Sequence, residues 1–228
     1  MAAAPRHADH GVMSSPRSLL LLFAGALAAL AVAGCDFADD GPRTTQTRDV
    51  GSFTQIDNGG SVDVRLRVGE KQRVKVWAGE KVIDDVRTEV HNGTLEIAFD
   101  HDGWGGNDVV VEASVPKLTG IEASGSGDID ADGIKAGAFE VRSDGSADIA
   151  LRGTVRRLAV DVTGSGDADL SDLAARDARV AVEGSGDTEV RAARRLDVAL
   201  DGSGDVRYHG DPALTRHVDG SGDLRHAG

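Results

Sequence analysis

The amino-acid sequence predicts an all-β fold of stacked coils, a β-solenoid, and two observations support this prediction. The first is a repeated turn: Gly-Ser-Gly-Asp occurs five times after residue 120, and Gly-Ser-Ala-Asp fills the one gap in the series. Successive turns begin 18 to 20 residues apart, and a fixed period of this length is typical of stacked repeats. The turns begin at Gly125, Gly145, Gly164, Gly184, Gly202 and Gly220.

The second observation is a set of apolar columns that emerges when the turns are aligned. Four residues before each of the first, second, third, fourth and fifth turns stand Ile121, Val141, Val160, Val180 and Val198. Two residues before the six turns stand Ala123, Ser143, Val162, Val182, Leu200 and Val218. Polar residues separate the columns, so each repeat is expected to be a strand, a turn, a second strand and a variable connection. One such unit cannot bury its own apolar face, whereas stacked units can.

The first 35 residues are predicted to be a lipoprotein signal peptide rather than part of the fold. Arg17 precedes an apolar run that is short for a membrane span but suits a signal-peptide core. The run ends in Val-Ala-Gly-Cys, which resembles a bacterial lipobox, and Cys35 is the one cysteine of the sequence. We therefore expect lipidation at Cys35, an attachment to the membrane through that lipid, and a true start at Met13.

The next segments are a tether and the start of the folded domain. Residues 36–46 are polar and are expected to connect the lipid to a domain that spans 47–228. Within that domain, residues 61–68, 72–79 and 94–99 alternate apolar and polar side chains as strands do. Residues 80–90 are ambiguous and allow one helical turn, and Asn-Gly-Thr at 92–94 predicts a turn before a strand.

The repeated turns also place one aspartate of each repeat in a column along the stack. In the first interpretation of this column each aspartate bonds backbone N–H groups of its own turn and carries shape only. In the second, the column binds calcium between rungs, although the residues two positions further on do not form a second ladder of oxygen ligands. The column consists of Asp128, Asp148, Asp167, Asp187, Asp205 and Asp223.

Composition and motifs narrow the classes of function. The formal charge of -13 argues against a nucleic-acid partner, because phosphate binding requires basic patches. No catalytic residues are predicted: the sequence holds no His-Glu-x-x-His motif and no phosphate-binding loop, and six equivalent aspartates do not provide two acids in different environments. No cofactor is expected apart from the calcium alternative.

The order of the motifs is similar to that of a known bacterial family. "NGGSVDVRLRVGEKQRVKVWAGEKVIDDVRTEVHNGTLEIAF", then "VEASVPKLTGIEASGSGDI", then serial Gly-Ser-Gly-Asp turns resembles the putative auto-transporter adhesin, head GIN domain family over about residues 47–228. The resemblance implies a right-handed parallel β-helix, a lipoprotein signal in many members, and an adhesive or envelope role without conserved catalytic residues.

Together these observations predict a membrane-anchored lipoprotein of the bacterial cell envelope that faces the periplasm or the cell surface. Its expected function is non-enzymatic, adhesin-like binding of a polysaccharide or an envelope protein. Two alternatives stay open at this stage: a polysaccharide-processing β-helix enzyme, and a purely structural envelope protein. The enzyme would need a localised pair of acids, whereas in the other two cases no single residue is decisive.

Overall fold

A computed structural model describes residues 40–100 and 109–227 of the chain. In this part of the chain fifteen strands join into one hydrogen-bonded sheet, accompanied by one short 3-10 helix. None of the described residues lies in a helix long and apolar enough to cross a membrane. The strands are β1 Arg43–Arg48, β2 Gln55–Asn58, β3 Asp63–Val68, β4 Arg73–Gly79, β5 Val86–His91, β6 Thr94–Phe99, β7 Val110–Val115, β8 Gly120–Ala123, β9 Ile129–Ser143, β10 Ile149–Val162, β11 Ala168–Val182, β12 Thr188–Leu200, β13 Val206–His209, β14 Ala213–Val218 and β15 Leu224–His226; the helix is η1 Ile83–Asp85.

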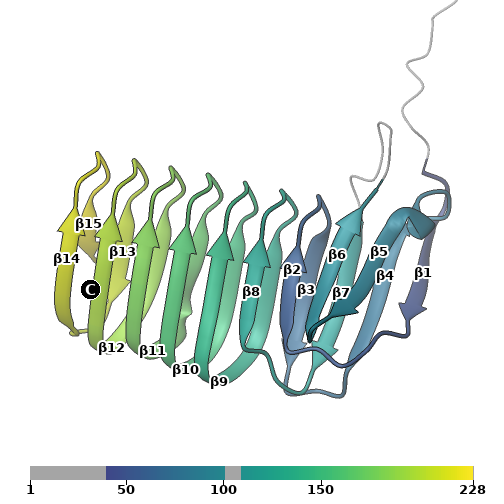
Figure 1. The fold of residues 1–228 in the computed structure, drawn as a ribbon, viewed down its shortest axis with the longest axis horizontal. Helices are drawn as coiled ribbons and strands as arrows, with labels where there is room; N and C mark the ends of the chain where they lie inside the picture. Colours follow the sequence, from purple (N-terminus) through teal and green to yellow (C-terminus); the bar gives the residue numbers. More distant parts are fainter. Residues whose placement is uncertain (1–39, 101–108, 228) are drawn as a thin grey trace, which may run out of the picture. The chain divides into compact units, whose positions relative to one another are not determined.

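The predicted solenoid is confirmed. Strands β9, β10, β11 and β12 pair in parallel, one coil above the next, and the Gly-Ser-Gly-Asp turns form a row along one edge of the stack (Figure 1). The register places each residue that follows the turn aspartate beside its equivalent in the next coil, as Ile129, Ile149 and Ala168 illustrate. The regular 18-to-20-residue period therefore corresponds to one coil of the solenoid.

The predicted variable connection is instead continuous strand. Each of β9, β10 and β11 runs for 14 or 15 residues from one turn to the next and bends sharply halfway, opposite the turns (Figure 1). A register shift marks the bend of β10, where Gly153 has a positive φ of 150°. Hydrogen bonding to both neighbouring coils keeps the bent segment extended, and no pattern within a single repeat contains that constraint.

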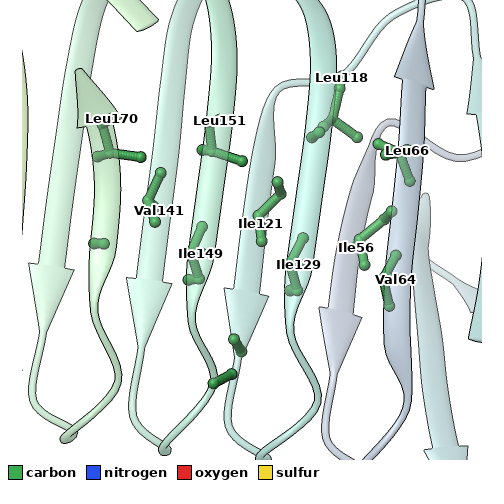
Figure 2. Close-up of a cluster of buried hydrophobic side chains, with 14 of the residues drawn as sticks. Ile56, Val64, Leu66, Leu118, Ile121, Ile129, Val141, Ile149, Leu151 and Leu170 are labelled. Atoms are coloured by element: carbon green, nitrogen blue, oxygen red, sulfur yellow. The ribbon is translucent and has the colours of Figure 1, made fainter. Parts of the chain in front are cut away.

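The bends and turns fold the sheet into two facing layers with the apolar core between them. The first layer contains β4, β7 and β3 and the half of each long strand that follows a turn; the second contains β6, β2, β8 and the half that precedes a turn. Figure 2 shows Ile129 and Ile149 of the first layer and Ile121 and Val141 of the second. These four side chains are at most 3% exposed, so the apolar columns read from the sequence are the core.

Close packing between coils explains the glycines of the turns. None of the turn glycines has a positive φ; the positive-φ glycines of the described residues lie elsewhere, for example Gly133 and Gly153 at the bends. A Cβ atom on Gly166 would instead lie 2.6 Å from the carbonyl carbon of Ala147 in the preceding coil, a separation that real Cβ atoms essentially never show. Five of the six turns carry glycine at this position, where adjacent backbones nearly touch, and the exception is Ala147 in the Gly-Ser-Ala-Asp turn.

The segment before the regular coils is more complex than a simple succession of rungs. The helical turn η1 and the Asn92-Gly93 turn between β5 and β6 occur where the sequence allowed them, with φ of 52° and 81° at the two turn residues. Strand β7 lies between β4 and β3, so the β2–β3 rung is inserted between later segments of the chain. Strand β1 pairs antiparallel with β4 from Arg43, four residues before the predicted domain boundary at 47.

The last rung differs from those before it. All six residues of β14 are exposed, including Leu214 at 37% and Val218 at 41%. Arg216 stands in register with Val198 of β12, in a column that is apolar in the preceding coils. A charge in an inward-facing position is a common device against pairing with another strand.

Candidate functional site

The turn aspartates form a continuous hydrogen-bonded ladder along one edge of the solenoid. The Oδ1 atom of each aspartate accepts a bond from the backbone N–H of the aspartate in the next coil. The N–O distances are 2.8 to 3.0 Å, from Asp148 N–H to Asp128 Oδ1 through to Asp223 N–H to Asp205 Oδ1. All six predicted residues thus lie in one column, and each of the first five carboxylates ties its coil to the next.

The ladder begins one rung earlier than the sequence indicated. The N–H of Asp128 bonds Oδ1 of Asp63 at 3.1 Å, and Asp63 ends a Gly-Ser-Val-Asp turn between β2 and β3. Buried Asn58 stabilises this turn, since its Nδ2 donates to the carbonyls of Val62 at 2.8 Å and Gly127 at 3.1 Å. The tetrapeptide beginning at Gly60 was the available signal, but Val62 replaces the third residue and 65 residues separate this turn from the next.

Two arginines form ion pairs with the last three aspartates, at the C-terminal end of the ladder. Arg207 lies 3.3 Å from Asp187, and Arg225 bonds Asp205 at 2.8 Å and Asp223 at 2.6 Å. The bond to Asp223 and the charge of Asp205 raise the pKa of Arg225. These arginines stand two positions after their aspartates, where a calcium ladder would need further oxygen ligands. Within the described ranges no group of three or more His, Cys, Asp or Glu side chains is placed to hold a metal ion. The calcium interpretation stays a prediction that an experiment can test.

A shallow depression beside the turns is the acidic groove of the molecule. It runs over β3, β9, β10 and β11, and Arg65 is the one basic residue of its lining. Its acidic lining consists of Asp63, Asp128, Asp130, Asp148, Asp167 and Asp169. An acid pair of the enzyme alternative in this groove would draw on six acids, of which four have Oδ1 in the ladder just described and bond the backbone.

A second row of acids crosses the outer face of the second layer. Glu89 pairs in register with Glu96, Glu96 with Asp57, and Asp57 with Glu122. Burial, with the charges of Glu122 and Glu96, raises the pKa of Asp57, and its Oδ1 atom is buried without a hydrogen-bond partner. This row was not anticipated because its members come from four separate strands. The like charges of this row repel one another and so oppose the ionisation of Asp57.

The two edges of the solenoid carry opposite charge. The turn edge, defined as residues 124–128, 144–148, 163–167, 183–187, 201–205 and 219–223, contains ten Asp or Glu residues and no Lys or Arg. The bend edge, defined as residues 135–138, 154–157, 174–177 and 192–195, contains six Lys or Arg residues and one Asp. The bend edge was missed because its residues lie in the segments interpreted as variable connections.

Comparison with known proteins agrees with this architecture. Residues 52–212 match the family described as "Putative auto-transporter adhesin, head GIN domain". The chain belongs to this family. No curated protein has a sequence that matches the chain.

Solved structures of other bacterial proteins share the fold. A putative adhesin from Bacteroides fragilis has a TM-score of 0.70 and 20% identity, covering 82% of this chain and 97% of its own. Putative adhesins from Parabacteroides merdae and Parabacteroides distasonis have TM-scores of 0.52 and 0.53, with 16% and 19% identity. They cover 82% of this chain and 97% and 98% of their own lengths. At these identities the likeness shows the fold alone.

Proposed function

We propose that this chain is a lipid-anchored protein of the bacterial envelope that binds a surface ligand without chemical turnover, in the manner of an adhesin. The observation that carries this proposal is the division of the solenoid into an apolar interior and long polar side faces repeated coil after coil. Such faces offer the same groups at regular intervals, which suits a repetitive ligand such as a polysaccharide. Membership of an adhesin-like family supports the same conclusion.

One experiment distinguishes the binding of a polysaccharide from its cleavage. The full chain, purified in a neutral detergent, is applied to an array of bacterial and host polysaccharides, with retention and released sugar measured together. Retention without release is expected. Release of cleaved sugar would support the enzyme alternative, and an absence of retention on glycans and on envelope proteins would leave the structural alternative.

The anchor is tested separately, because Cys35 and the predicted signal peptide lie outside the described residues. Growth with a labelled fatty acid should label the wild-type chain in the membrane fraction. The Cys35→Ser variant should carry no label and should leave that fraction. A labelled Cys35→Ser variant, or an unlabelled wild-type chain, would contradict lipidation at this residue.

A further inference from the structure

The bend edge is the surface from which this inference starts. Its basic residues are exposed, and the strands that carry them are adjacent and parallel. They are Lys135, Arg156, Arg157, Arg176, Arg194 and Arg195. Neighbouring strands stand ~4.8 Å apart, so the cations form a line along the solenoid axis rather than an isolated cluster. In Figure 1 this edge is the lower margin of β9 to β12, opposite the turns.

The guanidinium groups of this line are largely uncompensated. Arg156 stands opposite Arg176, because Val155 pairs with Ala175 and Arg157 with Asp177 on either side. Asp177 is the one acid of the bend edge, and it bonds Arg194 at 2.6 Å. That bond and the nearby Arg176 and Arg195 lower the pKa of Asp177, so its charge persists at neutral pH. Within the described residues, Arg156, Arg157, Arg176 and Arg195 make no ion pair.

The other concentration of basic residues is arranged differently. Arg65, Arg67 and Arg73 are exposed on β3 and β4 of the first layer. Acids occupy the neighbouring register positions there, since Arg65 pairs with both Glu112 and Asp130 and Arg67 pairs with Asp132. The alternation cancels charge locally on that face. On the bend edge Asp177, between Arg157 and Arg195, is the one acid in register with the basic residues, although the whole chain has a formal charge of -13.

The surface beside the line is hollowed, and the large apolar residues that line it, Phe139 and Leu158, are buried. A shallow depression lies next to it, bordered by Lys117 and Arg157 and floored by Gly137 and Ala138. Among the described residues the exposed large hydrophobic side chains are Leu214 and Val218, both on β14 at the end of the stack. Of the six basic residues only Arg195, which pairs with Ala213, lies next to that strand. A membrane-binding surface usually combines cations with such apolar groups, so the composition favours a polar ligand over a bilayer.

We propose that the bend edge binds a linear anionic polysaccharide, whose carboxylate, sulfate or phosphate groups lie along the row of guanidinium groups. The planar fork of arginine pairs with such oxyanions through two parallel hydrogen bonds. The acidic turn edge repels the same polymer and so orients the solenoid on it. This inference rests on the proposed adhesin-like function and names the ligand class of that function.

The test compares two variants that lose equal charge. Arg156→Gln/Arg176→Gln/Arg195→Gln removes three of the six basic residues of the bend edge. Arg65→Gln/Arg67→Gln/Arg73→Gln is the matched control. The full chain in neutral detergent is titrated with fluorescent polygalacturonate, with neutral dextran as the reference polymer. The bend variant should bind about tenfold more weakly and the control within about threefold of wild type. Equal losses in both variants, or no binding by wild type, would overturn the proposal.

A gain-of-binding variant guards against an effect of misfolding. Asp177→Asn frees Arg194 and should tighten binding about twofold, with a steeper loss of affinity as salt rises. Unchanged or weaker binding by this variant would count against the bend edge. Anionic phospholipid vesicles and single-stranded oligonucleotide are titrated in parallel, and equal or tighter binding of either by the wild-type chain would refute the assignment to polysaccharide.

The proposed function is tested separately, by measuring the retention of the same variants on the polysaccharide array and on intact cells. Retention that survives in the bend variant, combined with no binding of polygalacturonate by wild type, would reject the ligand class and keep the adhesin-like function. Release of sugar, or no retention of the wild-type chain anywhere, would reject the function itself.

Discussion

Gly166 provides a direct test of the close packing between coils. A Cβ atom at this position would meet the carbonyl carbon of Ala147 at 2.6 Å, whereas ordinary contact begins at 3.4 Å. The carbonyl oxygen of Ala147 would lie closer still, so the turn must move away from the preceding coil by more than about 0.8 Å in the Gly166→Ala and Gly166→Val variants. The displaced element is backbone on both sides, so no side chain can rotate to relieve the clash.

The expected cost follows from the bonds that span this contact. Ser165 N–H bonds the Gly145 carbonyl at 2.9 Å, Asp167 N–H bonds Asp148 Oδ1 at 2.8 Å, and Ile149 N–H bonds the Asp167 carbonyl at 2.8 Å. A neutral bond contributes about 1 kcal/mol net and one to a carboxylate about 1.5–3 kcal/mol, so losing all three costs about 4 kcal/mol. For a domain of this size that corresponds to a fall in Tm of about 8–16 °C. Most of the fall should already be seen with alanine, because the clash arises at Cβ.

The assay is thermal melting followed by circular dichroism, with hydrogen exchange to locate the loosened coils. Ser165→Ala, at the exposed tip of the same turn, is the control and should stay within about 0.5 kcal/mol of wild type. Ala147→Gly makes the opposite change at the equivalent turn position, where the methyl group is fully buried. It should destabilise by about 1–2 kcal/mol through lost burial and added chain entropy. A Gly166→Ala variant that melts within about 2 °C of wild type would refute the close-contact explanation of the turn.

Four further predictions concern the polar groups. Asp57→Asn should raise the Tm at neutral pH: the raised pKa means that the folded chain holds this proton more tightly, so the ionised carboxyl costs stability as pH rises through its folded pKa. The gain should vanish below about pH 4, where the unfolded-state carboxyl is also protonated; a destabilised variant at pH 7 would contradict this reasoning. Asn58→Ala should cost about 2–4 kcal/mol in denaturant unfolding, because two buried carbonyls lose their donor, and a cost below about 1 kcal/mol would show that the side chain does not secure the first turn. Asp148→Ala should cost about 1–3 kcal/mol by removing the acceptor of the Asp167 N–H, whereas Asp148→Asn keeps an acceptor and should cost less. Calcium should leave the wild-type Tm unchanged if the aspartates serve only the turns, and a calcium-dependent rise would support the cation ladder.

The coils could be predicted from the sequence because their determinants recur in every repeat. Val141, Val160 and Val180 occupy one column, and each turn begins with a glycine, so the period alone identifies residues that become neighbours. The first rung was not recognised, because Val62 alters its turn and the inserted strands β4 to β7 separate it from the regular repeats. Sequence patterns report neighbours reliably only while the spacing between them stays constant.

By itself, the sequence determined the all-β class, the solenoid period, the apolar columns and the place of the six aspartates. Only the tertiary structure decided where each coil bends, and hence that Arg156 and Arg176 come to lie side by side. It also decided that Asp57 meets Glu96 and Glu122. The physical reason is that burial is encoded locally by alternating side chains, whereas the charge of a surface depends on which distant segments the backbone hydrogen bonds bring into register.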